Sequence, residues 1–242
     1  MAVLPGRAAV AVAPSRVSAA PVTFVIPTLN EQAGIGRLLG LISTEFPDSQ
    51  CVVVDGGSDD RTVEIAMPLC HALITSESGR AVQMNLGAQI AGGDYLLFLH
   101  ADSMPTVSAR ELQVILTDSP LWGFCRVQLD GPERIYRVLE WAMNTRSRLT
   151  RVATGDQMLF VQRAEFIRLG GFASIPLMED IELSKRLRRQ QAPSIIAAPV
   201  ITSSRRWRVR GVWRTVLDMW ALRLAYVLGV SPQRLWQHYY GR

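Results

Sequence analysis

The chain of 242 residues is long enough for one large α/β domain or two small ones, and its 48% hydrophobic and 19% charged residues are ordinary for a globular protein. Its three cysteines are widely spaced, which excludes a disulfide framework and a paired-cysteine zinc site and fits a reducing compartment. The net charge of +5 comes from residues 205–242, which hold eight arginines and one aspartate, so the rest of the chain is slightly acidic.

Residues 1–20 contain many alanines and valines, two arginines and no acid. Targeting peptides can have such a composition, but a continuous apolar core is missing, so we expect a disordered extension. Runs of about 18 uncharged apolar residues are missing from the whole sequence, which predicts no membrane-spanning helix.

Short apolar runs lead straight into acidic polar loops at three places. Residues 24–27 lead to Thr28-Leu29-Asn30-Glu31, residues 52–54 to a loop from Asp55 to Asp60, and residues 95–99 to His100-Ala101-Asp102. Such runs are typical of strands buried on both faces of a parallel sheet. Ligands of these sheets bind beyond the carboxyl ends of the strands, so we expect one acidic cleft, suited to a phosphate carried with a divalent metal ion.

Helical periodicity separates these strands. It predicts helices over 35–42, 62–69 and 81–91, with a weak strand over 72–74. Later patterns predict strands over 124–129 and 158–161 and helices over 135–143, 179–189 and 216–228. The alternation predicts an α/β fold on a mostly parallel sheet flanked by helices, to which the second half of the chain is appended.

Three glycines after the first strand, Gly34, Gly36 and Gly40, resemble a dinucleotide-binding fingerprint. That fingerprint needs its first glycine at the tight turn between strand and helix, whereas Gly34 lies seven residues beyond Pro27. The glycines fall within a helical pattern instead, so a dinucleotide-binding dehydrogenase is not expected.

Four motifs occur in an order that resembles a known family. They are Pro27-Thr28-Leu29-Asn30-Glu31, Asp55 to Thr62, the acidic loop at Asp102, and Met178-Glu179-Asp180 at a helix start. Between about residues 22 and 210 the chain resembles a family 2 glycosyltransferase of the GT-A fold. Gly79 to Ala88 and Leu97 to Asp102 look like the bacterial subfamily linked with arsenosugar biosynthesis. The expected division is an extension over 1–20, a single GT-A domain over 21–210 and a basic amphipathic helical segment over 211–242.

The resemblance implies a pocket for a nucleotide-diphosphate sugar. Asp55 would contact the nucleotide base, and Asp102 would be the last acid of a loop that binds Mg²⁺ or Mn²⁺, with the ion bridging the phosphates. The other residues expected in this pocket are Pro27, Thr28, Asn30, Glu31, Gly57, Ser58, Arg80, Asn85 and Ala101. Asp55 can alternatively be read as a helix cap, although Asp59 and Asp60 fit a capping role better.

His100 stands where the family more often has an aspartate. Imidazole binds metals but prefers softer ions. His100 is therefore either a second metal ligand beside Asp102 or a buried, hydrogen-bonded histidine.

Glu179 and Asp180 are the candidate catalytic acids. Carboxylates at a helix N-terminus are favoured by the helix dipole, so a simple charge preference is the alternative interpretation. The resemblance implies that Asp180 is the general base. A base that lies opposite the leaving group gives a single displacement with inversion.

Three further groups of residues have a functional and a neutral interpretation. Arg80 precedes a helix N-terminus and is either a phosphate ligand or a solvated arginine. Gly155-Asp156-Gln157 lines the acceptor site or is a turn. Arg206-Trp207 resembles a pair that contacts the diphosphate in processive relatives, but Ser203 stands at the position of their glutamine, so polymerisation is not predicted.

The sequence therefore predicts an inverting, metal-dependent transferase that moves a sugar from a UDP- or GDP-type donor to a hydroxyl acceptor. One alternative is a nucleotidyltransferase, which usually has a Gly-rich basic loop where this chain has Thr28 to Glu31. The other is a catalytically silent module that binds nucleotide sugars or docks on a membrane.

Arginines and aromatic residues are interleaved in the basic C-terminal segment, 205–242. The aromatic side chains either pack onto the main domain, with the arginines as a solvated face, or contact an anionic membrane leaflet. The expected location is cytoplasmic. In the membrane interpretation the protein is peripheral on the inner face of the cell membrane, and its acceptor is lipid-linked. A nucleic-acid partner is not expected, because no reading motif accompanies the charge.

Overall fold

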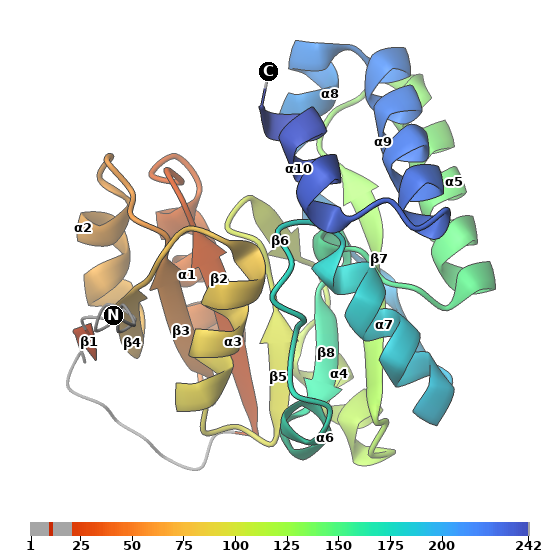
Figure 1. Ribbon diagram of the computed structural model, residues 1–242. Coiled ribbons are helices and arrows are strands. Elements are labelled where there is room, and N and C mark those ends of the chain that lie inside the picture. The colour runs from red at the N-terminus through yellow and green to blue at the C-terminus, as the bar shows by residue number, and fades with distance from the viewer. Residues whose placement is uncertain (1–9, 12–20, 242) are drawn as a thin grey trace, which may run out of the picture.

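One sheet runs through the part of the chain that the computed structural model describes, residues 10–11 and 21–241 (Figure 1). Its strands are β1 (Val10–Ala11), β2 (Val22–Thr28), β3 (Gln50–Asp55), β4 (Ala72–Thr75), β5 (Tyr95–Phe98), β6 (Ser103–Pro105), β7 (Trp122–Leu129), β8 (Leu159–Gln162) and β9 (Ser194–Thr202). The α-helices are α1 (Ile35–Glu45), α2 (Thr62–Ala66), α3 (Arg80–Ile90), α4 (Ala109–Thr117), α5 (Arg134–Thr150), α6 (Arg163–Arg168), α7 (Glu179–Gln190), α8 (Arg205–Arg210), α9 (Val212–Val227) and α10 (Pro232–Tyr240). The expected disorder of residues 1–20 lies outside the described residues, apart from β1, which pairs with β4.

The order of strands in the sheet is β1-β4-β3-β2-β5-β8-β7-β9-β6. β4, β3, β2 and β5 are parallel, as the sequence predicts. β8 runs antiparallel to β5, with Leu159 opposite Phe98. β7 is antiparallel to β8 and parallel to β9, and β6 is antiparallel to β9. The reversal at β8 brings the start of that strand to the edge where the parallel strands end, so the second half of the chain contributes residues to the same edge.

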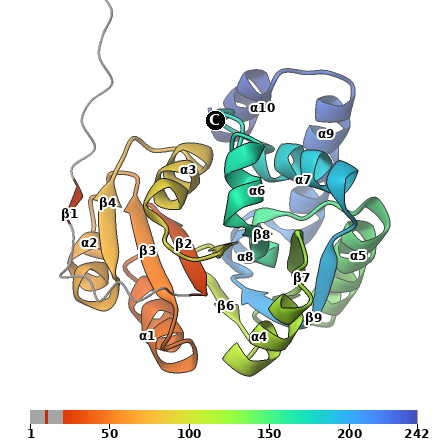
Figure 2. The ribbon, with the colours of Figure 1, turned by 90° about the horizontal axis from the view of Figure 1, so that it is seen from below.

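Side chains of β2 alternate between two cores on opposite faces of the sheet. Phe24 and Ile26 pack with residues of α1, α2 and α4, whereas Val25 packs with α3, α6 and α7. Figure 2 shows α1 and α4 on one side of the strands and α3, α6 and α7 on the other. All seven residues of β2 are buried, which explains why the strand has a continuous apolar sequence.

Several elements, among them α4, α6, α10, β6 and β9, were not evident from periodicity. α4 nevertheless has a sequence signal at its start, because the Ser108 side chain and Glu111 form a capping box. β9 contains Pro199, and its pairing with β7 shifts register between Cys125 and Arg126. A strand interrupted in this way lacks the regular alternation by which strands are recognised.

At the C-terminal end of the chain, α8 leads into α9, which stands beside α5, and α10 lies on the other side of α9 (Figure 1). Trp207 of α8 is buried against Leu129 and Tyr136, as the interpretation of a packed segment predicts. The same interpretation is wrong for Trp213 and Trp220 of α9, each of which is 73% exposed. In residues 10–11 and 21–241, none of the helices has the length and apolar character that crossing a membrane requires.

Candidate active site

The loops that follow β2 and β5 open onto three adjoining cavities. The first, of about 480 Å³, is lined in part by Glu31 and meets the second, of about 290 Å³, at Asp102. The second meets the third, of about 100 Å³, at Arg80 and Asp156, and Asp180 lines the third. A cleft therefore runs from the loop after β2 to the start of α7. Of the acidic residues expected at the strand ends, Glu31 and Asp102 lie along it, whereas Asp55 lines none of the three cavities.

Asp55 ends β3 and is almost completely buried, at 1% exposure. Its carboxylate accepts hydrogen bonds from the hydroxyls of Thr28 (3.0 Å) and Ser58 (2.5 Å) and from the backbone N–H groups of Gly57 (3.0 Å) and Ser58 (2.8 Å). The Ser58 hydroxyl in turn accepts a hydrogen bond from the Asn30 N–H at 2.8 Å. Asp55 thus holds together the loops that follow β2 and β3, and a contact with a nucleotide base would replace one of these hydrogen bonds.

Gln83, which sequence reasoning missed, joins the same two loops. Its side-chain amide donates to the carbonyl oxygens of Thr28 and Val54, both at 2.8 Å. A buried glutamine in a helix gives no distinct sequence signal, because its partners are distant in the chain. Asp60 has the capping role expected of it, since its carboxylate accepts from the Thr62 N–H at the start of α2 (2.9 Å).

Three residues expected in the donor pocket are buried or held by the backbone. Pro27 and Ala101 are buried. The Asn85 amide forms two hydrogen bonds with the backbone of Phe172, donating to its carbonyl oxygen at 2.8 Å and accepting from its N–H at 2.9 Å. Asn85 therefore fastens α3 to the loop that precedes α7.

Charges of both signs meet where the first two cavities join, because Asp102 and Arg205 line both of them. Burial raises the pKa of Glu31, and the nearby carboxylate of Asp102 raises it further, while Arg205 lowers it. A diphosphate in this part of the cleft would be repelled by both carboxylates, and Arg205 together with a bound cation would offset that repulsion.

His100 and Gly155 are in close contact. A Cβ atom added to Gly155 would lie 2.5 Å from Cε1 and 2.7 Å from Nε2 of His100, so only glycine fits here. Burial lowers the pKa of His100, and Arg80 lowers it further, against the opposing effect of Asp156 and Asp102. The imidazole is therefore neutral at pH 7, which suits either of the roles considered for it.

The side chains around the second cavity decide whether a metal ion fits there. Within residues 10–11 and 21–241, no group of three His, Cys, Asp or Glu side chains is arranged to hold one. His100, Asp102 and Asp156 do line the same cavity. Mg²⁺ is commonly bound by one or two carboxylates together with substrate phosphates and water. The residues present thus fit an ion that a diphosphate helps to hold.

Glu179 and Asp180 begin α7, directly after Met178, whose φ of 70° places it in the left-handed region. Glu179 is 4% exposed, and burial raises its pKa to about 7, with a further contribution from Asp180 and an opposing one from Arg80. Asp180 is partly exposed, and its Oδ2 accepts from the Gly155 N–H at 2.8 Å. This hydrogen bond joins the start of α7 to the segment before β8.

Three arginines act electrostatically on Asp180. Arg80 was expected in the cleft, whereas Arg146 of α5 and Arg223 of α9 were missed. Burial lowers the pKa of Arg146 to about 10, and Arg223 lowers it further, while Asp180 opposes the change. Because Arg146 and Arg223 come from helices far apart in the sequence, their electrostatic interaction with Asp180 could not be read from spacing.

The expected acceptor residues have different environments. Asp156 lines the second and third cavities. Gln157 is fully buried. The oxygen of its side-chain amide accepts hydrogen bonds from the Ser147 hydroxyl (2.8 Å) and from the Thr154 N–H (3.1 Å). Of the triplet, Asp156 and Gly155 face the cleft, and Gln157 fixes the turn.

Arg206 and Trp207 lie on α8 and line the second cavity, as the diphosphate interpretation requires. Arg206 also stands over the ring of Tyr239, 5.7 Å from its centroid. Tyr239 and Tyr240 of α10, which were not expected in the site, line the third cavity. α10 thus forms a wall of the cleft.

Known proteins resemble this chain in sequence and in structure. The model of the family Glycosyl transferase family 2 matches residues 23–168, more than half of the chain. An uncharacterized glycosyltransferase of Haemophilus influenzae is 24% identical over 180 residues, which are 68% of this chain and 61% of that protein. A PGL/p-HBAD biosynthesis glycosyltransferase of Mycobacterium bovis is 38% identical over 93 residues, 35% of this chain and 36% of that protein.

Two solved structures share the fold. A mannosyltransferase from Pyrobaculum calidifontis in complex with GDP-Man and Mn²⁺ has a TM-score of 0.60 at 24% identity, covering 88% of this chain and 63% of that one. A crystal structure of TarS from S. aureus has a TM-score of 0.60 at 17% identity, covering 76% of this chain and 60% of that one. The chain therefore spans about three fifths of the length of these structures and of the Haemophilus relative. The predicted α/β fold of GT-A type is confirmed.

The family match begins in β2, passes through the loops of Asp55 and Asp102, and ends with α6. It includes the parallel strands that form the cleft and stops before Glu179. The chain belongs to glycosyl transferase family 2.

Proposed function

We propose that the protein is an inverting, metal-dependent glycosyltransferase that moves a sugar from a nucleoside-diphosphate sugar to a hydroxyl acceptor. The observation that carries the proposal is the continuous cleft between Glu31 and Asp180. In this arrangement the nucleoside lies near Asp55, the diphosphate lies in the middle of the cleft, and the sugar and the acceptor meet at Asp180.

The middle of the cleft is suited to a diphosphate. Arg80, Arg205 and Arg206 line the second cavity, and guanidinium groups bind phosphate oxygens with two parallel hydrogen bonds. Arg80 also begins the 11-residue helix α3, where free backbone N–H groups favour an anion. Asp102, with His100 or Asp156, would hold a Mg²⁺ or Mn²⁺ ion there. When bound, such an ion offsets the negative charge of the leaving diphosphate.

We propose a UDP- or GDP-type donor. The Pyrobaculum mannosyltransferase was crystallised in complex with GDP-Man and Mn²⁺, and S. aureus TarS in complex with UDP and with UDP-GlcNAc. These ligands belong to those proteins, and they support nucleoside diphosphates as the first compounds to test on this one.

Asp180 is the proposed base. Its carboxylate takes the proton of the acceptor hydroxyl, whose oxygen forms a bond to the anomeric carbon of the sugar. The bond from that carbon to the diphosphate breaks on the opposite side, so the configuration inverts. The hydrogen bond from the Gly155 N–H orients the Asp180 carboxylate at the third cavity.

Glu179 is the second candidate for the base. A pKa of about 7 would leave it partly ionised at neutral pH and able to accept a proton. With Glu179 as the base, log(kcat/KM) should rise with unit slope below about pH 7 and level off above it. That inflection should disappear in Glu179→Gln and persist in Asp180→Asn.

Binding of UDP and of GDP, measured by titration calorimetry with Mn²⁺ and with EDTA, tests the proposed donor site. Affinity should fall strongly in EDTA and in Asp102→Ala, while Asp118→Ala, which changes an exposed acid at the end of α4, should bind as the wild type does. Equal affinity with and without EDTA would contradict the metal-assisted site.

A donor assay separates the enzyme classes considered for the sequence. Release of a nucleoside diphosphate from UDP- or GDP-sugars is expected. Release of pyrophosphate from nucleoside triphosphates would indicate a nucleotidyltransferase, and binding without any turnover would indicate a silent module.

A further inference from the structure

Two neighbouring helices, α5 and α9, each present a row of large apolar side chains to solvent. On α5 the row consists of Val138, Trp141 and Leu149. On α9 it consists of Trp213, Leu217, Trp220 and Leu224. These side chains are between 58% and 73% exposed. We call the two rows together the α5–α9 face.

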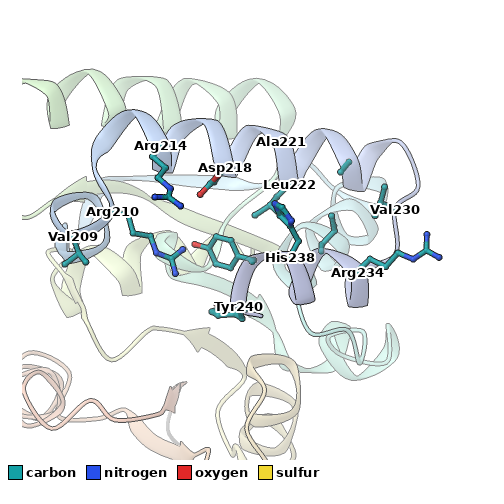
Figure 3. A pocket seen from close by; sticks show the side chains of 13 residues that line it. Val209, Arg210, Arg214, Asp218, Ala221, Leu222, Val230, Arg234, His238 and Tyr240 are labelled. Carbon is teal, nitrogen blue, oxygen red and sulfur yellow. The ribbon is translucent and has the colours of Figure 1, made fainter. Parts of the chain in front are cut away.

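The α9 row follows from helical geometry. Its residues are spaced by four, three and four positions, so they lie on one side of the helix. Val216 and Met219, on a second side, pack against α5. Leu222 and Ala225, on a third side, line a cavity of about 530 Å³ between α9 and α10 (Figure 3). The exposed row therefore takes part in neither of the two intramolecular contacts of α9, the one with α5 and the one on the side of α10.

An exposed surface of this composition is unusual for a protein that acts alone in water. Three of the six tryptophans of the chain lie on it. Contiguous exposed apolar patches mark sites of contact with proteins, ligands or membranes. Tryptophan in particular is enriched at the boundary between water and lipid, because its large ring is apolar and its N–H is polar.

The charges around the face identify what covers it. Arg134 and Arg148 of α5 lie on the same side of that helix as Trp141, since they are separated from it by seven positions each way. Arg214 and Asp218, four positions apart on α9, both line the cavity on another side of that helix. A contact between two copies of this face would set one positively charged surface against another, which is unfavourable.

We propose that the α5–α9 face docks on an anionic lipid bilayer. The tryptophans and leucines enter the boundary between headgroups and acyl chains, and the arginine stems extend toward the lipid phosphates. The cavity between α9 and α10 then lies next to the membrane. It shares Leu222, Tyr239 and Tyr240 with the cavity that contains Asp180, so an acceptor carried on a lipid would have a short path to the proposed base.

Flotation with lipid vesicles tests the docking face independently of enzymatic activity. The full chain should float with vesicles of phosphatidylglycerol and phosphatidylcholine at low salt, and much less with pure phosphatidylcholine. Binding should weaken as salt rises, because arginine–lipid attraction is screened. Lipids brominated in the acyl chain should quench tryptophan fluorescence, since Trp141, Trp213 and Trp220 would lie within reach of the bromine.

The double variant Trp141→Ser/Trp220→Ser should bind the anionic vesicles at least about tenfold more weakly, because each ring loses the burial of a large apolar surface. Val114→Ser/Ile167→Ser is the matched control, since these side chains on α4 and α6 are also exposed but lie away from the face. All four positions are exposed, so neither variant should alter the thermal unfolding temperature greatly.

Absence of flotation at low salt would overturn the proposal, as would equal binding by the two double variants. Light scattering of the free protein at several concentrations distinguishes the remaining alternative. A dimer that Trp141→Ser/Trp220→Ser converts to a monomer, with no vesicle binding by the wild type, would make the face a contact between copies of the chain. Loss of transferase activity alone would not affect the flotation result.

Discussion

Glu179 and Asp180 are neighbours in the chain, but their carboxyl groups have different surroundings. Glu179 is buried, whereas Asp180 is partly exposed, accepts from the Gly155 N–H and is attracted by Arg146 and Arg223. The two acids are therefore suited to different tasks, and substitutions at each should have distinct effects.

Asp180→Asn removes the proposed base but keeps the shape of the side chain and a hydrogen-bond acceptor for Gly155. Sugar transfer should fall by about two to four orders of magnitude, the usual contribution of general base catalysis. Affinity for the nucleoside diphosphate should stay close to that of the wild type. Initial rates and calorimetry on the same preparation check both statements, and near-normal turnover would transfer the role of base to Glu179 or Asp156.

Glu179→Gln should stabilise the protein at alkaline pH. Burial raises the pKa of Glu179 from its ordinary 4.5 to about 7, so the folded protein loses stability as pH rises between these values and the buried carboxyl ionises. Above pH 7 the variant should be more stable than the wild type, by on the order of 2 kcal/mol, and the difference should vanish near pH 4.5.

Urea unfolding of the wild type and of Glu179→Gln between pH 4.5 and 8 measures this difference. Glu45→Gln, at an exposed position at the end of α1, serves as the control and should show little dependence on pH. A stability difference that is the same at every pH would mean that Glu179 acts through packing and not through its charge.

The loops after β2 and β3 act as one element because Asp55 links them. Asp55→Ala would leave the hydroxyls of Thr28 and Ser58 and two backbone N–H groups without their acceptor. Thr28 is buried, and an unsatisfied buried donor costs about 1–3 kcal/mol, whereas Gly57 and Ser58 are accessible to water. We expect a loss of about 1–3 kcal/mol of unfolding free energy, together with weaker UDP or GDP binding.

Chemical denaturation and calorimetry test the Asp55 prediction, with the exposed Asp59→Ala as control. Loss of nucleotide affinity with unchanged stability would instead indicate that Asp55 serves the ligand directly and that the loops hold together without it.

Elements buried on both faces of the sheet could be predicted from the sequence, because each position of such a strand must be apolar. β2, β3 and β5 are of this kind, and their positions fix the acidic ends that define the cleft. β9 was missed because it alternates irregularly between buried and exposed positions and contains Pro199.

The site residues that could be predicted lie at the ends of strands and helices. Asp102 and Asp180 follow directly from this rule. Gln83, Arg146 and Arg223 could not be predicted, because they come from helix interiors and their partners are set by the packing of α3, α5 and α9. Side-chain reach of this kind depends on three-dimensional contacts that no local pattern encodes.

At the scale of the whole molecule, the packing of Leu235 connects helices that are distant in the sequence. It is 4% exposed and packs in a cluster with Leu222 of α9 and Ile181 of α7. Leu235→Ala should destabilise the protein by about 2–4 kcal/mol, as large-to-small core substitutions do. Because α10 carries Tyr239 and Tyr240 into the cleft, transfer should also slow.

Urea unfolding and initial rates check the effects of Leu235→Ala. Leu228→Ala is the control, since Leu228 is exposed beyond the end of α9 and should change neither quantity by much. A destabilised variant with normal kinetics would show that α10 does not shape the acceptor side.

The two hydrogen bonds between Asn85 and Phe172 have a consequence for the order in which the substrates bind to the enzyme. They connect α3, which begins at the proposed phosphate ligand Arg80, to the segment before Glu179 and Asp180. A donor that fixes the position of Arg80 would thereby also fix the position of Asp180, the proposed base. We therefore expect the donor to bind before the acceptor in a compulsory order. Asn85→Leu would break this connection, and product-inhibition patterns should then change from ordered to random.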